Sequence, residues 1–307
     1  MSLQRVAAID CGTNSIRLLV ADLDPESGQL HDLDRRMTIV RLVQDVDRTG
    51  RLAPEALERT FAACREYAAV IGQHGIEGDG VPRLRFVATS ASRDAENRDE
   101  FVAGVRAILG VEPEVITGQE EAQLSFTGAT RELAGSELTP PYLVFDLGGG
   151  STEFVLGSDR VEAARSVDIG CVRMTERHGG DTLAMRADIK QALDLAAETV
   201  PLTGAATLVG LAGTATTVAG IALGLPAYDS TAIHHSRIPL ARVREVTAML
   251  LAASHEERAA IPVMHPGRVD VISAGALVLL AIMERSGASE LVVSEHDILD
   301  GIAWSLV

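Results

Sequence analysis

The feature that most constrains this chain is a short pattern that occurs twice, near the N-terminus and again near the middle. In each copy an apolar, strand-like run ends in aspartate, a glycine-containing turn follows, and a second strand-like run comes directly after it. The copies are Asp10-Cys11-Gly12-Thr13-Asn14-Ser15 and Asp146-Leu147-Gly148-Gly149-Gly150-Ser151. Aligning Asp10 on Asp146 also aligns Gly12 on Gly148 and Ser15 on Ser151. A repeated supersecondary unit of this kind predicts two related α/β domains that face each other.

The two turns have the chemistry of phosphate-binding loops. Glycine-rich turns between strands leave backbone N–H groups that can converge on phosphate oxygens, because glycine adopts the turn geometry and lets an anion come close. A single such turn is typical of an ordinary hairpin. Two turns, each with an aspartate at its start and a hydroxyl residue inside, indicate a shared phosphate site. The predicted phosphate-binding residues are Gly12, Thr13, Asn14, Ser15, Gly148, Gly149, Gly150 and Ser151.

The aspartates that open the turns are candidate metal ligands. If the two domains face each other, Asp10 and Asp146 lie on opposite walls of a cleft. Their carboxylates can then hold a hydrated Mg²⁺ between them and the substrate phosphates. We therefore expect Mg²⁺ as the cofactor.

Length and charge bound the class of protein. The chain has 307 residues, of which 47% are hydrophobic, and this length exceeds that of most single domains. We predict domains over residues 1–124 and 125–307, each with one of the two turns. The formal net charge of −16 argues against a protein that coats nucleic acid or an anionic membrane. A polyanionic substrate would need a local electropositive cleft, made by Mg²⁺ and a few arginines.

The sequence predicts a cytoplasmic protein. The N-terminus enters an apolar strand at once, without the pattern of a signal peptide. The longest apolar tract, residues 271–283, is shorter than the ~20 residues of a membrane span and predicts a buried core helix. Three cysteines without metal spacing, Cys11, Cys64 and Cys171, make a disulfide framework unexpected. A homodimer is the default expectation for a cytosolic protein of this size.

Apolar periodicity predicts alternating strands and helices in both halves. Strands are expected at residues 6–9, 16–23, 38–43, 84–88, 142–145, 154–156, 207–211 and 291–293. Helices are expected from Pro54 to about Ile71, at 97–109, around Glu120 and Glu121, and at 183–200, 214–223, 240–252, 269–285 and 298–306. Residues 132–141 have the composition of a loop.

Other catalytic classes find little support in the sequence. A P-loop ATPase is excluded because no Walker motif precedes Lys190, the only lysine. The pairs His234-His235 and His296-Asp297 lack the further ligands of a metal phosphohydrolase, and we interpret them as surface or helix-start residues. Cys11 lies within the first turn beside Asp10, a setting that disfavours a nucleophilic thiolate, and we interpret it as a small buried residue.

Four further motifs complete a resemblance to a known family. The four motifs are Ala88-Thr89-Ser90-Ala91-Ser92-Arg93-Asp94-Ala95, Gly118-Gln119-Glu120-Glu121-Ala122, Gly213-Thr214-Ala215-Thr216-Thr217 and Arg268-Val269-Asp270. They occur in addition to the two turns. Their order along the chain resembles the exopolyphosphatase/guanosine pentaphosphate phosphohydrolase family. The resemblance implies two ribonuclease-H-like domains of the actin, Hsp70 and sugar-kinase superfamily around a cleft. It also implies that inorganic polyphosphate or a guanosine polyphosphate is the substrate.

The resemblance also implies roles for single residues. Glu121 would be the general base that deprotonates the attacking water; without the resemblance it would be interpreted as a solvated acid at a helix start. Glu153 would be an auxiliary base or a ligand on the metal side. Arg93 would bind substrate phosphate through its planar guanidinium. Arg17 and Arg268 are weaker candidates for that role, because each could instead pair with an acidic neighbour.

Two departures from the family pattern affect the expected substrate. Thr13 stands where serine is frequent in the family, which keeps a hydroxyl group. The chain stops at Val307, so we expect it to lack the C-terminal helical domains with which longer members grip long polymers. Short polyphosphate chains or nucleotides are therefore the expected substrates.

Two rival functions fit the same motifs. An actin-like, ATP-binding regulator could use both turns and the segment 213–217 to hold ATP. A small-molecule kinase of the same fold would need an acceptor site in addition, and the setting of Glu121 fits water better than a sugar hydroxyl. Phosphate release from polyphosphate without an acceptor would distinguish the hydrolase from both.

Overall fold

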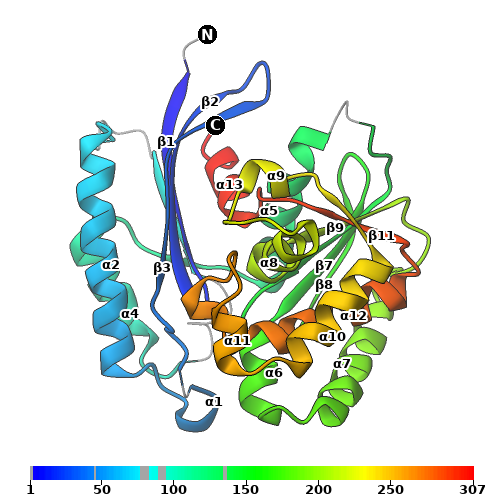
Figure 1. The fold of residues 1–307 in the computed structure, drawn as a ribbon. Coiled ribbons are helices and arrows are strands. Elements are labelled where there is room, and N and C mark those ends of the chain that lie inside the picture. Colours follow the sequence, from blue (N-terminus) through cyan, green and yellow to red (C-terminus); the bar gives the residue numbers. More distant parts are fainter. Residues whose placement is uncertain (1–2, 45, 77–82, 89–94, 134–136) are drawn as a thin grey trace. The chain divides into compact units, whose positions relative to one another are not determined.

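The computed structural model describes residues 3–44, 46–76, 83–88, 95–133 and 137–307. The chain forms two compact units (Figure 1). Unit 1 contains Met1–Ala134 and, from the other end of the chain, Ile298–Val307. Unit 2 contains Gly135–Asp297. Each unit is built on one mixed β-sheet.

The sheet of unit 1 has the strand order β3-β2-β1-β4-β5. Strands β1 (Gln4–Cys11), β2 (Ser15–Asp24) and β3 (Gln29–Ile39) are successive antiparallel neighbours. Strands β4 (Leu84–Ala88) and β5 (Glu114–Val115) continue the sheet in parallel beyond β1. The helices of this unit are α1 (Val46–Thr49), α2 (Pro54–Gln73), α4 (Arg98–Leu109), α5 (Gly118–Thr130), the 3₁₀ turn η1 (Arg131–Leu133) and α13 (Ile298–Trp304).

Helices cover both faces of this sheet because its side chains alternate in direction. Ala7, Ile9 and Cys11 of β1 belong to one apolar cluster with residues of α2 and α4. Val6 and Ala8 belong to a second cluster with residues of α5 and α13. Asp10 alternates with Cys11 and therefore lies on the face that carries α5 and α13.

The sheet of unit 2 has the order β10-β11-β9-β6-β7-β8. Strands β6 (Tyr142–Leu147), β7 (Thr152–Gly157) and β8 (Val161–Val167) are successive antiparallel neighbours. Strands β9 (Thr207–Leu211) and β11 (Glu290–Val293) run parallel to β6, and β10 (Arg237–Pro239) closes the far edge.

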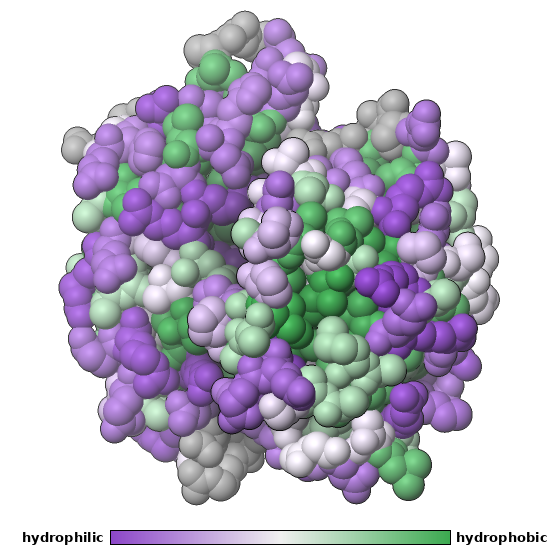
Figure 2. Space-filling view, in the orientation of Figure 1, coloured by the Kyte–Doolittle hydropathy of each residue, from purple (hydrophilic) through white to green (hydrophobic). Residues whose placement is uncertain are grey.

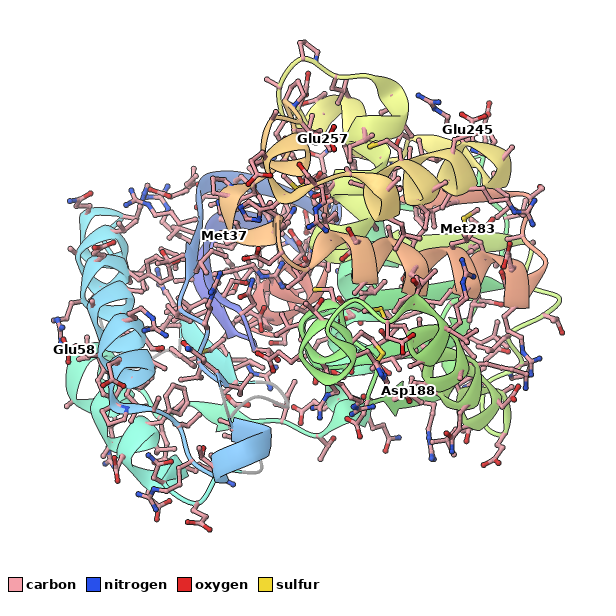
Figure 3. All side chains as sticks on the ribbon, turned by 60° about the horizontal axis from the view of Figure 1, so that its bottom comes forward. Met37, Glu58, Asp188, Glu245, Glu257 and Met283 are labelled. Atoms are coloured by element: carbon pink, nitrogen blue, oxygen red, sulfur yellow. The ribbon has the colours of Figure 1, made fainter. Side chains whose placement is uncertain are left out.

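One large apolar core holds the helices of unit 2 against this sheet. It joins Leu143, Phe145 and Leu147 of β6 to residues of the long helices. Met283 of α12 is fully buried in it, whereas Glu245 lies at the periphery (Figure 3). The helices are α6 (Cys171–His178), α7 (Thr182–Ala197), α8 (Ala212–Leu223), α9 (Ser230–Ile233), α10 (Leu240–Ala252), α11 (His255–Ala259), η2 (Pro266–Arg268) and α12 (Ile272–Ser286).

The two units repeat one topology. In each, three antiparallel strands are followed by two that run parallel to the first, so that β1, β2, β3, β4 and β5 correspond to β6, β7, β8, β9 and β11. This order is that of the ribonuclease-H-like fold that the family resemblance implies. The predicted α/β fold class and the internal repeat are therefore confirmed.

The structure differs from the sequence predictions in several places. The strand predicted at residues 38–43 is confirmed only at residues 38 and 39, because β3 ends at Ile39 and Arg41 adopts a left-handed φ of 47°. The sequence missed most of β3 because its side chains are largely exposed and show no apolar alternation. The unit boundary lies at 134/135 rather than 124/125, and residues 298–307 return to unit 1. Packing between α5 and α13 explains both differences.

The buried helix predicted over residues 271–283 is α12, and ten of its 15 residues are buried. Among the described residues, no helix combines the length and apolarity needed to cross a bilayer. Figure 2 shows a mostly hydrophilic face, interrupted by hydrophobic residues in its right half.

Candidate functional site

The turn between β1 and β2, here called loop 1 (residues 12–15), is closed by one hydrogen bond and clamped by the chain that follows β3. The amide of Gly12 donates to the carbonyl of Ser15 at 2.9 Å. The amides of Val40 and Arg41 donate to the Asn14 carbonyl at 3.0 and 2.9 Å, and the Val43 amide donates to the Thr13 carbonyl at 3.5 Å. The segment predicted as a strand therefore serves as the clamp of loop 1.

The turn between β6 and β7, here called loop 2 (residues 148–151), has the same closing bond and a different clamp. The amide of Gly148 donates to the carbonyl of Ser151 at 3.1 Å. The first amides of α6 then donate to the loop: Cys171 to the Gly148 carbonyl at 3.1 Å and Val172 to the Gly149 carbonyl at 2.9 Å. The N-terminus of α6 is thus satisfied by loop 2 itself.

The clamps set the direction of the loop amides. In a trans peptide the C=O and the next N–H point in opposite directions. Because the carbonyls of Gly148 and Gly149 face α6, the amides of Gly149 and Gly150 point away from it. The side chain of Arg173 extends the pattern, since its Nε donates to the Gly150 carbonyl at 2.8 Å and so turns the Ser151 amide outward. Within the described part of the chain, no backbone carbonyl accepts from these three amides.

Glycine at position 170 permits the close approach of α6 to loop 2. A Cβ at Gly170 would lie 2.3 Å from the Gly149 carbonyl oxygen and 2.6 Å from the Gly150 nitrogen. Both atoms belong to backbone, so they cannot move aside as the end of a side chain could. The sequence analysis missed Gly170; the only signal for it was its place directly before α6.

In loop 1 the leading aspartate is paired with an arginine across the strands. Asp10 and Arg17 are opposite each other in the β1–β2 register. Nη2 of Arg17 lies 2.6 Å and Nε 3.0 Å from Oδ2 of Asp10, and the carboxylate is only 5% exposed. Arg17 thus pairs with an acidic neighbour, the alternative that the sequence left open for it.

Cys11, the next residue of β1, is fully buried among apolar side chains. Burial raises the pKa of its thiol well above the usual range, and the nearby Cys64 and Asp10 raise it further. The interpretation of Cys11 as a small buried residue is confirmed.

In loop 2 the leading aspartate faces a glutamate instead. Asp146 and Glu153 are opposite each other in the β6–β7 register, at the positions that correspond to Asp10 and Arg17. Their side chains share one face of the sheet, and they are 8% and 2% exposed. The hydroxyl of Ser166 donates to Oε1 of Glu153 at 2.6 Å. Two buried acidic side chains therefore lie opposite each other on adjacent strands that flank loop 2.

Glu121 lies in the first turn of α5, and its side chain is 8% exposed. The interpretation of Glu121 as a solvated helix-start acid is therefore wrong. Its neighbour Glu120 fills that role, because its carboxylate is exposed and pairs with Arg85 at 3.0 Å. The hydroxyl of Thr117 caps the helix by accepting from the Glu120 amide. Since α5 packs on the face that carries Asp10, Glu121 and Asp10 belong to the same side of the unit 1 sheet.

Arg268 holds the start of α8. Its Nη1 donates to the Gly213 carbonyl at 2.9 Å and to the Thr217 hydroxyl at 2.8 Å. A Cβ at Gly213 would lie 2.1 Å from the guanidinium, so a larger residue there would displace the Arg268 side chain. A role of Arg268 in binding phosphate stays a prediction. Arg93, the other predicted phosphate ligand, lies outside the described residues.

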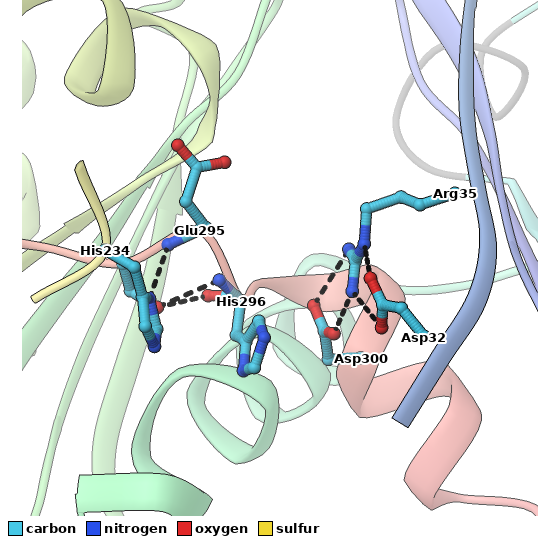
Figure 4. Close-up of polar contacts among 7 residues, drawn as sticks. Asp32, Arg35, His234, Glu295, His296 and Asp300 are labelled. Atoms are coloured by element: carbon cyan, nitrogen blue, oxygen red, sulfur yellow. Dashed lines mark hydrogen bonds and ion pairs between the residues drawn. The ribbon is translucent and has the colours of Figure 1, made fainter. Parts of the chain in front are cut away.

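The structure stacks three histidines that the sequence analysis interpreted as separate surface or helix-start residues. The ring centroids of His234 and His235 are 3.7 Å apart, and those of His234 and His296 are 4.7 Å apart. The Glu295 amide donates to Nδ1 of His234 at 3.1 Å (Figure 4). The described residues contain no group of three or more His, Cys, Asp or Glu side chains that could hold a metal ion. The contacts of His234 with His296 and Glu295 join residues some 60 positions apart, so no local signal could reveal them.

The predicted site residues divide between the units. Loop 1, Asp10, Arg17 and Glu121 belong to unit 1, whereas loop 2, Asp146, Glu153 and Arg268 belong to unit 2. Within each unit the structure gathers them at one end of the sheet. The predicted cleft that would join both sets stays a prediction.

Comparisons with known proteins identify relatives over the whole chain. The sequence profile of the Ppx/GppA phosphatase family matches residues 19–307. Exopolyphosphatase 2 of Mycobacterium tuberculosis strain H37Rv is 51% identical, over all of this chain and 99% of that protein. A guanosine-5'-triphosphate,3'-diphosphate pyrophosphatase of Aeromonas hydrophila is 28% identical, over 98% of this chain and 59% of its own length.

Solved structures have the same fold. A crystal structure of an exopolyphosphatase-like protein matches with a TM-score of 0.92 and 44% identity, over 99% of this chain and 97% of that chain. A Ppx/GppA family member of Aquifex aeolicus matches with a TM-score of 0.82 and 28% identity, over 99% of this chain and 97% of that chain.

Proposed function

Because the chain belongs to the Ppx/GppA phosphatase family, we propose that it hydrolyses the terminal phosphoanhydride bond of inorganic polyphosphate, with guanosine pentaphosphate as a second substrate. The relative that is 51% identical along its full length is an exopolyphosphatase, which favours polyphosphate. The guanosine pyrophosphatase at 28% identity supports the nucleotide as a second substrate.

The observation that carries the proposal is the direction of the loop 2 amides. Three successive N–H groups, those of Gly149, Gly150 and Ser151, point away from α6, which already donates to the loop carbonyls. Successive amides in a turn form a concave site for anionic oxygens. Loop 1 offers the amides of Asn14 and Ser15 in the same way, because the carbonyls before them face the clamp at residues 40–43. Phosphoryl oxygens are the ligands that such loops bind best.

The two acidic residues that flank loop 2 also fit Mg²⁺. This ion keeps several waters and is usually bound by one or two carboxylates together with substrate phosphates. Asp146 and Glu153 provide two buried carboxylates on adjacent strands beside the amides. When bound, Mg²⁺ neutralises charge on the phosphoryl oxygens. Asp10 was predicted as a further ligand; in this proposal its carboxylate instead holds Arg17, whose guanidinium it binds at 2.6 Å.

Glu121 would activate the attacking water. A positioned carboxylate can accept a proton from the reacting water in the transition state. Glu121 would take a proton from water as the water oxygen attacks the terminal phosphorus. The bond from that phosphorus to the bridging oxygen would break, leaving inorganic phosphate and a chain shorter by one phosphate.

A phosphate-release assay on three substrates tests the proposal. Polyphosphates of defined length, guanosine pentaphosphate and ATP are incubated with the enzyme, with and without Mg²⁺ and without an acceptor. We expect Mg²⁺-dependent release from polyphosphate and guanosine pentaphosphate. Release from ATP alone would favour an ATP-binding regulator, and release that requires an added acceptor would favour a kinase.

Replacing the base tests the mechanism. Glu121→Gln keeps the shape of the side chain and removes its basicity, so we expect kcat to fall by about 10²- to 10⁴-fold with the fold intact. Glu120→Gln is the matched control on the same helical turn, and its kcat should stay within about twofold because this exposed side chain contributes only a surface ion pair. Initial rates and thermal unfolding of both variants supply the comparison. A fully active Glu121→Gln variant would show that Glu121 is not the general base.

A further inference from the structure

The last helix of the chain completes unit 1. Helix α13 follows unit 2 in sequence, yet all seven of its residues are buried in unit 1. Its apolar side chains join those of β1, β2 and α5 in one cluster. The helix therefore lies on the sheet face that also carries Asp10 and α5.

Helix α13 touches α5 backbone to backbone. A Cβ at Gly301 would lie 2.0 Å from the carbonyl oxygen of Leu124 and 2.7 Å from its carbonyl carbon. An ordinary contact of a carbon with a carbonyl oxygen is about 3.3 Å or more. Leu124 is three residues after Glu121 on α5, so the two lie on the same side of the helix. The contact thus supports α5 one turn away from the proposed base.

Polar contacts at both ends hold α13 in place. The carboxylate of Asp300 is 1% exposed and binds Nη2 of Arg35 on β3 at 2.5 Å, while Arg35 also binds Asp32 (Figure 4). At the other end, the guanidinium of Arg131 lies 3.8 Å above the ring of Trp304. A helix of seven residues would not be stable alone, so these contacts and the apolar cluster fix its position.

We propose that α13 is the positioning element for Glu121 and that Gly301 is the positioning residue at its contact with α5. This inference rests on the proposed role of Glu121 as the base. Glycine at 301 lets α5 lie closer to α13 than any other residue would. That spacing sets how far Glu121 projects toward the attacking water.

Gly301→Ala tests the inference. The new methyl group must move α5 or α13 by about 1 Å, and a shift of that size at a catalytic group can lower turnover by up to about 100-fold. We expect kcat to fall about 10- to 100-fold with KM changed less than about twofold, because the phosphate loops are untouched. Amide hydrogen exchange at residues 121–124 should become faster, since the contact that protects α5 is lost.

Gly104→Ala is the matched control. Gly104 lies on α4 in the same unit, and a Cβ there would come within 2.2 Å of the Phe61 ring, on the opposite face of the sheet. We expect it to lower the melting temperature without changing kcat or exchange in α5. Arg35→Lys is a milder variant for the case in which Gly301→Ala folds poorly. It keeps the charge beside Asp300 but loses the forked geometry, and kcat should fall by about two- to fivefold.

The outcomes separate this inference from the proposed function. Normal kcat and normal exchange in Gly301→Ala would overturn the positioning role while Glu121 remains the base. An equal loss of kcat in Gly104→Ala would also overturn it, since general destabilisation would then explain both. Full activity of Glu121→Gln would instead show that Glu121 is not the general base, whatever the hydrogen-exchange data show for α5.

Discussion

Loop 1 and loop 2 have the same backbone hydrogen-bond pattern. They differ in the residue that lies opposite the leading aspartate on the neighbouring strand. Both close with a hydrogen bond between their first amide and their last carbonyl, and both are clamped through their carbonyls. The aspartate before loop 1 is paired with Arg17, whereas the aspartate before loop 2 lies opposite Glu153, a second acidic residue. The difference shows that two copies of one fold can carry different residues at the same position and so serve different roles. In the proposed function, the first copy would supply a phosphate loop beside an ion pair, and the second would supply the carboxylates for a cation beside its loop.

The largest expected effect contrasts the two aspartates. Asp146→Asn removes one of two adjacent carboxylates, so we expect kcat to fall by at least about 100-fold and the Mg²⁺ concentration for half-maximal activity to rise. Asp10→Asn breaks a buried ion pair, so we expect a loss of about 3 kcal/mol in unfolding free energy with an unchanged Mg²⁺ requirement. Phosphate release titrated with Mg²⁺ and urea unfolding of both variants supply the measurements.

If the Mg²⁺ requirement rises equally in both variants, the two aspartates do not differ in role, and Asp10 is a metal ligand as well. The double variant Asp10→Asn/Arg17→Met is a useful control. It removes both charges, so it should recover part of the stability lost by Asp10→Asn alone.

A smaller effect is expected from the clamp of loop 2. Gly170→Ala places a methyl group 2.3 Å from the Gly149 carbonyl, so α6 and the loop must separate. We expect kcat to fall about tenfold and unfolding free energy by about 1 to 3 kcal/mol. Gly220→Ala on α8 is the control, because its Cβ would meet only the Val263 side chain at 3.3 Å. If both variants are equally active, the spacing between α6 and loop 2 has no part in catalysis.

The smallest effect concerns the residue after each aspartate, Cys11 at the end of β1 and Leu147 at the end of β6. Burial raises the pKa of Cys11, so the folded state keeps its thiol protonated while the unfolded chain ionises at the ordinary thiol pKa. The stability from the neutral thiol is fully present below that pKa and is lost as the pH rises above it. We expect unfolding free energy to fall by up to about 1 kcal/mol per pH unit there.

Urea unfolding midpoints from neutral to alkaline pH measure this slope. Cys11→Ala should flatten it, although not completely, because burial also raises the pKa of Cys64 to about 12. Leu147 cannot ionise, so the corresponding position in unit 2 contributes nothing to the slope. A slope that Cys11→Ala leaves unchanged would mean that other groups cause it.

Much of the fold could be predicted because its signals are local. The strand at 84–88, the strand at 207–211 and the helix at 240–252 were each predicted with the bounds that the structure has. Each has a short apolar run or a helical period that is visible within its own residues. The prediction of β3 failed because an exposed edge strand has no such pattern. The segment after it donates hydrogen bonds to loop 1 instead of extending the strand.

The site was predictable in its residue types and not in its contacts. The Asp-Gly turns, their hydroxyl residues and Glu121 can be identified from the amino-acid sequence alone. The burial of Glu121 and the close approach of Gly170 to loop 2 are not, because both depend on packing against residues elsewhere in the chain.

The sequence by itself determined two aspartate-led glycine turns, their order along the chain and the α/β character of both halves. These features follow from backbone preferences and apolar periods that act over a few residues. Only the tertiary structure decided that Arg17 faces one aspartate and Glu153 the other, that loop carbonyls are clamped, and that α13 returns to support α5. Register and packing join residues far apart in sequence, and no local preference encodes which distant partner a side chain will meet.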